Sequence, residues 1–219
     1  MVRFIILVVI FPIGLSCCFN LWSLLISIYN TLDTNFYFIA GSIFSVVVML
    51  LFKKKLNFFT TFEHELTHNI WAVLFFRKPM GFHVRKDGSG LFEYESGSRL
   101  SNVFISLSPY FFPTACFLWL PFYVLCKDQF YWFYFLFMGV FFGYHIVSTL
   151  QETKLYQTDI TSNGIIYSFL LLFPLNVIFN GIILAHLHHG FKGIFNFLFM
   201  GHLNNCLLYT SDAADDSLR

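Results

Sequence analysis

Long apolar runs recur along most of this sequence, and they restrict its possible folds more than any other feature. A helix needs about 18 or more apolar residues to cross the roughly 30 Å hydrocarbon core of a bilayer. Hydrophobic residues make up 57% of the chain and charged residues only 11%, which is unusual for a soluble globular protein. We therefore predict an all-α polytopic membrane protein with about six transmembrane helices. The predicted helices cover residues 4–29, 36–52, 56–76, 103–125, 130–150 and 165–187, and a partial helix begins near Phe191.

Basic residues predict how these helices are oriented. Lys53, Lys54 and Lys55 form the strongest basic cluster of the chain, whereas the loop before residue 36 contains no basic residue. Cytoplasmic loops carry an excess of lysine and arginine, so we expect the three lysines to be cytoplasmic. The first apolar run is longer than the roughly 7–15 residues of a signal-peptide core, so we expect it to be retained as a span. We expect a multi-pass integral membrane protein, in the cell membrane if the source is bacterial.

The most polar stretch of the chain follows the third apolar run. Between residues 80 and 97, apolar side chains alternate with polar ones on both sides of the turn cluster "DGSG". This pattern predicts a small β-hairpin insert at or near a membrane surface. Two roles are open for it. Its exposed edge could hold an extended substrate as an added strand, or the hairpin could lie on lipid headgroups.

The last residues differ in character from the rest of the chain. From Cys206 the sequence "CLLYTSDAADD" resembles the translation of a sequencing-library adapter, so we exclude residues 206–219 from the fold. No linker in the remainder is long enough to divide it, and no internal repeat is present. We therefore expect residues 1–205 to form a single integral-membrane domain that carries the hairpin.

A metal-binding pattern lies in the third apolar run. In "HELTH", His64 and His68 are four residues apart, so on a helix both imidazoles project from one face and can share one ion. Glu65 is turned about 100° from His64 and can reach a water on that ion. This is the spacing of a zinc hydrolase, in which the metal lowers the pKa of water and the glutamate acts as the base. A structural polar cluster that faces a partner helix is the alternative reading.

Two histidines do not complete such a site, because catalytic zinc usually has a third protein ligand. Asp159 is the best candidate, since it follows a polar stretch at the start of an apolar run, where a helix N-terminus can aim a carboxylate inward. His145 could instead be a ligand or a supporting partner. The histidines of "HLHH" end a span near a lysine, which is typical of a membrane interface. The other residues considered are His83, Glu152, His186, His188 and His189.

Three short blocks carry a more specific resemblance. "FEHELTH" in an apolar helix with a hairpin after it, then "SLSPYFFP" and finally "QTDI" resemble the site-2 protease family of intramembrane zinc metalloproteases. The resemblance implies that His64, His68 and Asp159 bind zinc and that Glu65 is the catalytic base. The chain has "QTDI" where many members have an Asn-Pro-x-Asp-Gly or Leu-Asp-Gly sequence, and it lacks a PDZ-like insert. A small, PDZ-free subgroup is therefore the nearest match.

The expected function is intramembrane cleavage of other proteins in or near their transmembrane segments, by zinc and water. The prolines of "SPYFFP" would bend a helix and could shape the opening through which water reaches the metal. The expected partners are a membrane-protein substrate and the lipid bilayer, with no nucleic acid. Two other classes stay open. One is a membrane metal carrier, which would be expected to show internal repeats, and the other is a scaffold with a structural or lost zinc site.

Overall fold

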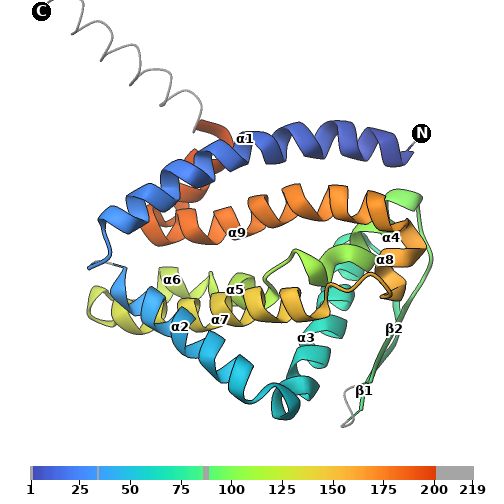
Figure 1. The fold of residues 1–219 in the computed structure, drawn as a ribbon, viewed down its shortest axis with the longest axis horizontal. Coiled ribbons are helices and arrows are strands. Elements are labelled where there is room, and N and C mark those ends of the chain that lie inside the picture. Colours follow the sequence, from blue (N-terminus) through green and yellow to red (C-terminus); the bar gives the residue numbers. More distant parts are fainter. Residues whose placement is uncertain (1, 34, 86–88, 201–219) are drawn as a thin grey trace, which may run out of the picture.

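The computed structural model of the protein describes residues 2–33, 35–85 and 89–200, and helices dominate it (Figure 1). Helices α1 and α9 form one layer, and α2, α5, α6 and α7 form the layer beside it. Helix α3 and the hairpin lie together at one end of the molecule, next to α4 and α8. In chain order the elements are α1 (Val2–Asn30), α2 (Phe36–Leu51), α3 (Lys53–Leu74), β1 (Pro79–Val84), β2 (Gly90–Tyr94), α4 (Arg99–Leu107), the short 3-10 helix η1 (Ser108–Tyr110), α5 (Thr114–Trp119), α6 (Phe122–Leu125), η2 (Asp128–Phe130), α7 (Tyr131–Glu152), α8 (Thr158–Asn163), α9 (Ile165–Phe195) and the π-helix η3 (Asn196–Met200).

Small residues allow the helices of each layer to approach closely. Gly139 and Gly143 of α7 are four residues apart and lie against the backbone of α2, at Phe38 and Ser42. Without a hydrophobic driving force between helices in lipid, such small-residue contacts increase van der Waals packing. Gly14 has the same role in the other layer, where it packs on Pro174 of α9.

Membrane-crossing segments are fewer than predicted. In the described part of the chain, three helices are long and apolar enough to span alone: Val2–Asn30, Asp128–Glu152 and Ile165–Leu187. Two further pairs qualify only as bent pairs, α2 with α3 at 112° and α4–η1 with α5–α6 at 89°. This gives three to five candidate spans, so the predicted number of six is not confirmed.

In each of the two bent pairs, residues at the bend explain why the predicted straight span is absent. Helix α3 was predicted to span by itself, but its glutamates and histidines lower its hydropathy, and it turns sharply away from α2 at Phe52. The predicted helix 103–125 is interrupted after η1. Pro113 lies at that interruption and cannot donate a backbone hydrogen bond, so the helical ladder stops and restarts at α5.

The hairpin prediction is confirmed by an antiparallel pairing of β1 with β2. Phe82 lies opposite Phe92 and His83 opposite Leu91, and the register shifts between Pro79 and Gly81. Part of the predicted turn, residues 86–88, lies outside the described residues, as does the segment 206–219 that the sequence excluded from the fold.

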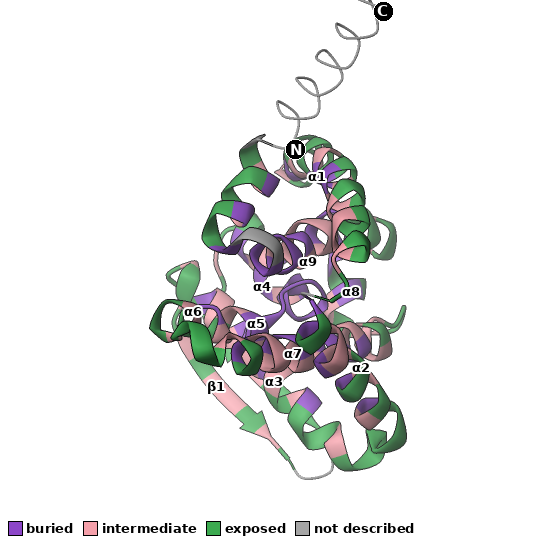
Figure 2. Cartoon of the chain, turned by 90° about the vertical axis from the view of Figure 1, so that its left-hand side faces the viewer, coloured by how far each residue is buried: buried purple, intermediate pink, exposed green. Residues whose placement is uncertain are grey.

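The largest cluster of buried apolar residues in the described chain packs against Trp71 of α3. Val103, Leu107, Tyr110, Ile160 and Leu171 are almost fully buried in one cluster that joins α4, η1, α8 and α9. Figure 2 shows buried residues gathered around α4, α5 and α9, while exposed residues cover the outer sides of α1 and α2. The outer residues are largely apolar, as a lipid-facing surface requires. The core thus holds the short elements that face the motif helix.

The α2–α7 contact gives a direct test of this packing. A Cβ atom at Gly139 would collide with the backbone carbonyl of Phe38, so we expect Gly139→Ala to destabilise the protein by about 1–3 kcal/mol. In an open helix the same change would stabilise. The measurement is the thermal unfolding midpoint in detergent. Gly81→Ala in β1 is the control, because its Cβ would make only ordinary contacts, and an equal midpoint shift in both variants would refute close packing at Gly139.

Candidate metal centre

Helix α3 presents the two motif histidines on the face turned toward η1 and α8. The imidazole rings of His64 and His68 have centroids 4.9 Å apart and are nearly perpendicular. This follows from the four-residue spacing, which places both residues one turn apart on one side of a helix. Both side chains are largely buried, with exposed fractions of 12% and 7%. Two imidazoles are thus directed into a common, sheltered space.

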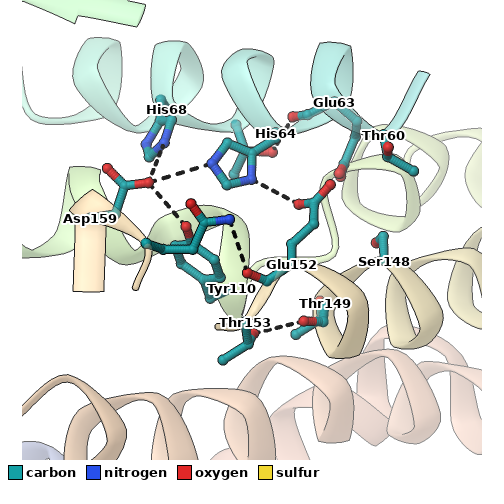
Figure 3. Close-up of polar contacts among 12 residues, drawn as sticks. Thr60, Glu63, His64, His68, Tyr110, Ser148, Thr149, Glu152, Thr153 and Asp159 are labelled. Carbon is teal, nitrogen blue, oxygen red and sulfur yellow. Dashed lines mark hydrogen bonds and ion pairs between the residues drawn. The ribbon is translucent and has the colours of Figure 1, made fainter. Parts of the chain in front are cut away.

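Asp159 of α8 meets these two histidines (Figure 3). Its Oδ2 lies 3.6 Å from the Nε2 of His64 and 3.6 Å from the Nε2 of His68. One ligand atom from each of the three residues lies within 4.8 Å of the others. Metal–ligand bonds of about 2.0–2.1 Å in a tetrahedron separate neighbouring ligands by roughly 3.3 Å, close to the two shorter distances. The donor set and its spacing therefore fit one zinc ion with a fourth position left open.

The backbone around α8 fixes the position of Asp159. The helix is short and ends at Gly164, whose φ of 90° is readily adopted only by glycine. Asn163 donates to the backbone carbonyl of Asp159 at 2.8 Å and to Ser106 Oγ of α4 at 2.6 Å. Burial of Ile160 in the core anchors the same turn. The aspartate is therefore held on a rigid turn.

Charge also suits Asp159 to a metal site. Burial would raise the pKa of Asp159, but the adjacent imidazoles of His64 and His68 have the larger combined effect and hold it below its ordinary range. The side chain is therefore a carboxylate anion, which is the form that binds a cation.

Each histidine is oriented by a partner on its other ring nitrogen. The Nδ1 of His64 lies 2.8 Å from Glu152 Oε2, and the Nδ1 of His68 lies 2.7 Å from the carbonyl oxygen of Ile105. A carboxylate and a carbonyl can only accept, so each Nδ1 carries the proton and donates it. When a ring is neutral, its Nε2 therefore carries the lone pair that metal ligation requires.

Tyr110 provides an orienting contact to the aspartate. Its hydroxyl donates to Asp159 Oδ2 at 3.0 Å, and its ring packs edge-on against His64 with centroids 5.3 Å apart. The sequence singled out the prolines of "SPYFFP" and not the tyrosine between them. Likewise, the sequence suggested Glu152 only as a metal ligand, whereas its carboxylate contacts the Nδ1 of His64. The sequence does contain one indication of a role for Glu152, because it is an acidic residue at the end of an apolar helix.

Glu65 lines the same cleft as the three clustered residues. The cleft has a volume of about 610 Å³, and Asn57, Thr61 and Gln157 contribute polar groups to its wall. The carboxylate of Glu65 lies against Gly90 at the start of β2, where a Cβ atom would collide with it. Glu65 is thus buried beneath the hairpin and still faces the space in front of the histidines.

The other predicted candidates lie away from this cluster. His145 of α7 is 2% exposed, and its Nδ1 lies 3.4 Å from Thr149 Oγ1. His186 pairs with the hydroxyl of Tyr134 at 2.9 Å. His83 lies on β1 and lines a neighbouring cavity with Phe62. The side chains of His188 and His189 are outside the described residues.

Residues 36–179 match the family model described as Peptidase M50B-like, which covers more than half of the chain. The chain belongs to this family. The match supports the resemblance to the site-2 protease family seen in the sequence, and it contains both the "HELTH" block and Asp159. Comparisons with curated proteins and with solved structures gave no match. Membership and the apolar helices together suggest an integral membrane peptidase, and peptidases of this family are generally metalloproteases.

Metal content tests the clustered residues. We expect the purified protein in detergent to bind one zinc ion per chain, and His68→Ala and Asp159→Ala to lose it, because two ligands do not hold zinc tightly. The measurement is metal per chain by elemental analysis. His83→Ala is the control and should keep its zinc. Full zinc in Asp159→Ala together with loss in His145→Ala would show that the third ligand is wrong.

The contact between Glu152 and His64 predicts that loss of Glu152 reduces zinc affinity less than loss of a ligand does. We expect Glu152→Ala to weaken zinc affinity by about 10–100-fold without abolishing binding, because the partner that orients the ring is lost. Competition with a zinc chelator measures this. Glu95→Ala, an exposed acid beyond β2, should leave the affinity unchanged. An effect of Glu152→Ala no larger than that of the control would remove the orienting role.

Proposed function

We propose that the protein is an intramembrane zinc metalloendopeptidase that cleaves transmembrane or membrane-proximal segments of other membrane proteins. The observation that carries this proposal is the convergence of two imidazoles, one carboxylate and a neighbouring glutamate on one polar cleft in an apolar chain. We further propose a multi-pass integral membrane protein, in the cell membrane if the source is bacterial, whose partners are a protein substrate and the bilayer.

His64, His68 and Asp159 are the proposed zinc ligands. Zinc held by these residues supplies a Lewis acid that polarises the scissile carbonyl and promotes deprotonation of water. The Nδ1 contacts to Glu152 and to the Ile105 carbonyl keep the two imidazoles in the tautomer needed for ligation. The hydroxyl of Tyr110 restrains the carboxylate of Asp159. These contacts support a preorganised site, since every ligand has a partner that limits its rotation.

Glu65 is the proposed general base and acid. Its carboxylate accepts the proton of the attacking water and delivers it to the amine of the leaving peptide. Its position next to the first ligand in sequence, in the same cleft, supports this role. Its carboxylate also lies against Gly90, so a peptide bound along β2 would lie near it.

Water reaches the proposed site through the polar cleft. Side chains from the start of α3 and from the segment around α8 line it, including Asn57, Thr61 and Gln157. Irregular backbone is tolerated at membrane depth where it lines such a cavity. The interruption between η1 and α5, at Pro113, is buried, and we propose that the prolines shape the opening indirectly, by placing the hydroxyl of Tyr110 against Asp159.

The hairpin is proposed to hold the substrate in an extended form. Among the described residues β2 pairs only with β1, and residues of β2 line the cleft whereas those of β1 do not. A substrate strand added along β2 would present main-chain carbonyls toward the histidines. A helical segment must unwind before its peptide bonds can be attacked, and pairing with β2 would offset part of that cost.

Replacement of Glu65 tests the proposed chemistry. Glu65→Gln keeps the size of the side chain but cannot accept a proton, so it should retain zinc and lose cleavage by about 10²–10⁴-fold or more. The measurement is cleavage of a membrane-tethered reporter by the purified variant in liposomes, with metal content determined on the same sample. Glu95→Gln serves as the control. Undiminished cleavage, or zinc transport by the wild-type protein, would favour the scaffold or carrier class instead.

A further inference from the structure

The cleft at the metal cluster has a second cavity beside it. Tyr94, Ser106 and Ser162 line both spaces, so the two are adjacent at the end of β2. The second cavity has a volume of about 390 Å³. Its remaining walls come from the start of α1, the segment before α4, α4 itself and the end of α8. It therefore lies beside the end of the strand proposed to hold the substrate.

Two arginines make the wall of this cavity positively charged. Arg3 and Arg99 line it, and no acidic residue does. A third arginine, Arg77, packs its guanidinium against Gly97, which is itself part of the wall. The metal cleft contains three acids, Glu65, Glu152 and Asp159, and one basic residue, Lys154. The cavity at the end of β2 thus has only basic charged residues in its wall, next to a cleft in which acids outnumber bases.

These guanidinium groups are available to a ligand. The ion pairs found among the described residues all involve His64 or His68, so none of the three arginines has a carboxylate partner there. Arg3 is held by the ring of Tyr167, with its Cζ 5.3 Å from the ring centroid. Arg99 is the first residue of α4, where a basic side chain gains nothing from the helix dipole. Among the described residues, therefore, the ring of Tyr167 contacts Arg3, and neither Arg3 nor Arg99 forms an ion pair.

The distance along β2 matches a short stretch of peptide. The carboxylate of Glu65 touches Gly90, and the ring of His68 stacks on Phe92 with centroids 5.9 Å apart. From these positions to Tyr94 is two to four residues, which is about 7–13 Å in a strand at roughly 3.3 Å per residue. A peptide extended along β2 with its scissile bond near the metal cluster would therefore reach the arginines a few residues away.

We propose that the cavity lined by Arg3 and Arg99 is a substrate subsite that binds an acidic side chain two to four residues from the scissile bond. The inference rests on the proposed function. A guanidinium group forms paired, charge-assisted hydrogen bonds to a carboxylate, which suits aspartate or glutamate. The cavity shares Tyr94, Ser106 and Ser162 with the metal cleft, so a peptide that leaves that cleft at the end of β2 would pass beside it. A substrate with an acidic residue where it leaves the apolar segment meets this requirement.

Binding to a cleavage-deficient protein tests the subsite separately from catalysis. The probe is a fluorescein-labelled apolar peptide with one glutamate scanned along it, compared with the same peptides carrying glutamine or lysine. The protein is Glu65→Gln in nanodiscs of neutral lipid. We expect the glutamate peptide to bind about five- to tenfold more tightly than the glutamine peptide at one position, as for a partly exposed charged pair.

Arginine variants locate the preference. In the Glu65→Gln background, the double variant Arg3→Gln with Arg99→Gln should bind the glutamate and glutamine peptides about equally tightly. Arg99→Glu should bind the lysine peptide more tightly than the glutamate peptide. The reversed preference in Arg99→Glu shows that the protein is folded. Lys127→Gln, which removes the same charge far from this cavity, should keep the preference of the parent protein. No preference at any position, or one that survives loss of both arginines, would overturn the proposal.

Binding in anionic lipid and cleavage by the wild-type protein distinguish the remaining explanations. If the arginine variants weaken all peptides equally, and only in nanodiscs with anionic lipid, then the cavity binds headgroup phosphate and the proposal is wrong. If the preference is present but the wild-type protein cleaves no glutamate-bearing reporter, then the proposed function fails and the subsite stands. If the wild-type protein cleaves glutamate and glutamine reporters equally well and binds both equally, then only the subsite fails.

Discussion

The hydrogen bonds on the outer nitrogens of His64 and His68 are the constraint on which the candidate site depends. Polar groups buried in an apolar bundle must be paired, and these two pairings draw in α7 through Glu152 and α4 through Ile105. Both Nε2 atoms are then left facing Asp159 of α8. A single set of pairings thus satisfies buried polar groups, joins four helices and leaves a ligand cluster open on one side.

Breaks in regular structure allow this cluster to exist in such an apolar chain. The bend at Phe52 turns α3 away from α2, and the interruption at Pro113 separates η1 from α5. Gly164 ends α8 and directs the chain into α9. Straight, closely packed helices would leave no room for a polar cleft, whereas these three breaks gather short elements at one end of the bundle. The long helices α1, α7 and α9 supply the apolar support.

The sequence predicted those features that depend on residues close together in the chain. His64, Glu65 and His68 follow from one helical turn, and the hairpin follows from alternation around a turn cluster. Asp159 was predicted from its place at a helix start and from the family resemblance. Glu152 and Tyr110 could not be assigned their contacts, because these arise only when α7 and η1 pack against α3. The predicted number of six spans is not confirmed, because apolar length does not reveal a bend.

The distribution of basic residues relates the cleft to the membrane. The N-terminal end of α1, the hairpin and α8 lie at the same end of the molecule (Figure 1). The strongest basic cluster, Lys53, Lys54 and Lys55, begins α3, and Asn57 and Thr61 in the next turns of that helix line the cleft. Because basic residues are enriched on the cytoplasmic side, this arrangement predicts that the cleft opens toward the cytoplasm. Water and an acidic substrate residue would then enter from the same side, where the arginines attract negative charge before the peptide reaches the metal cluster.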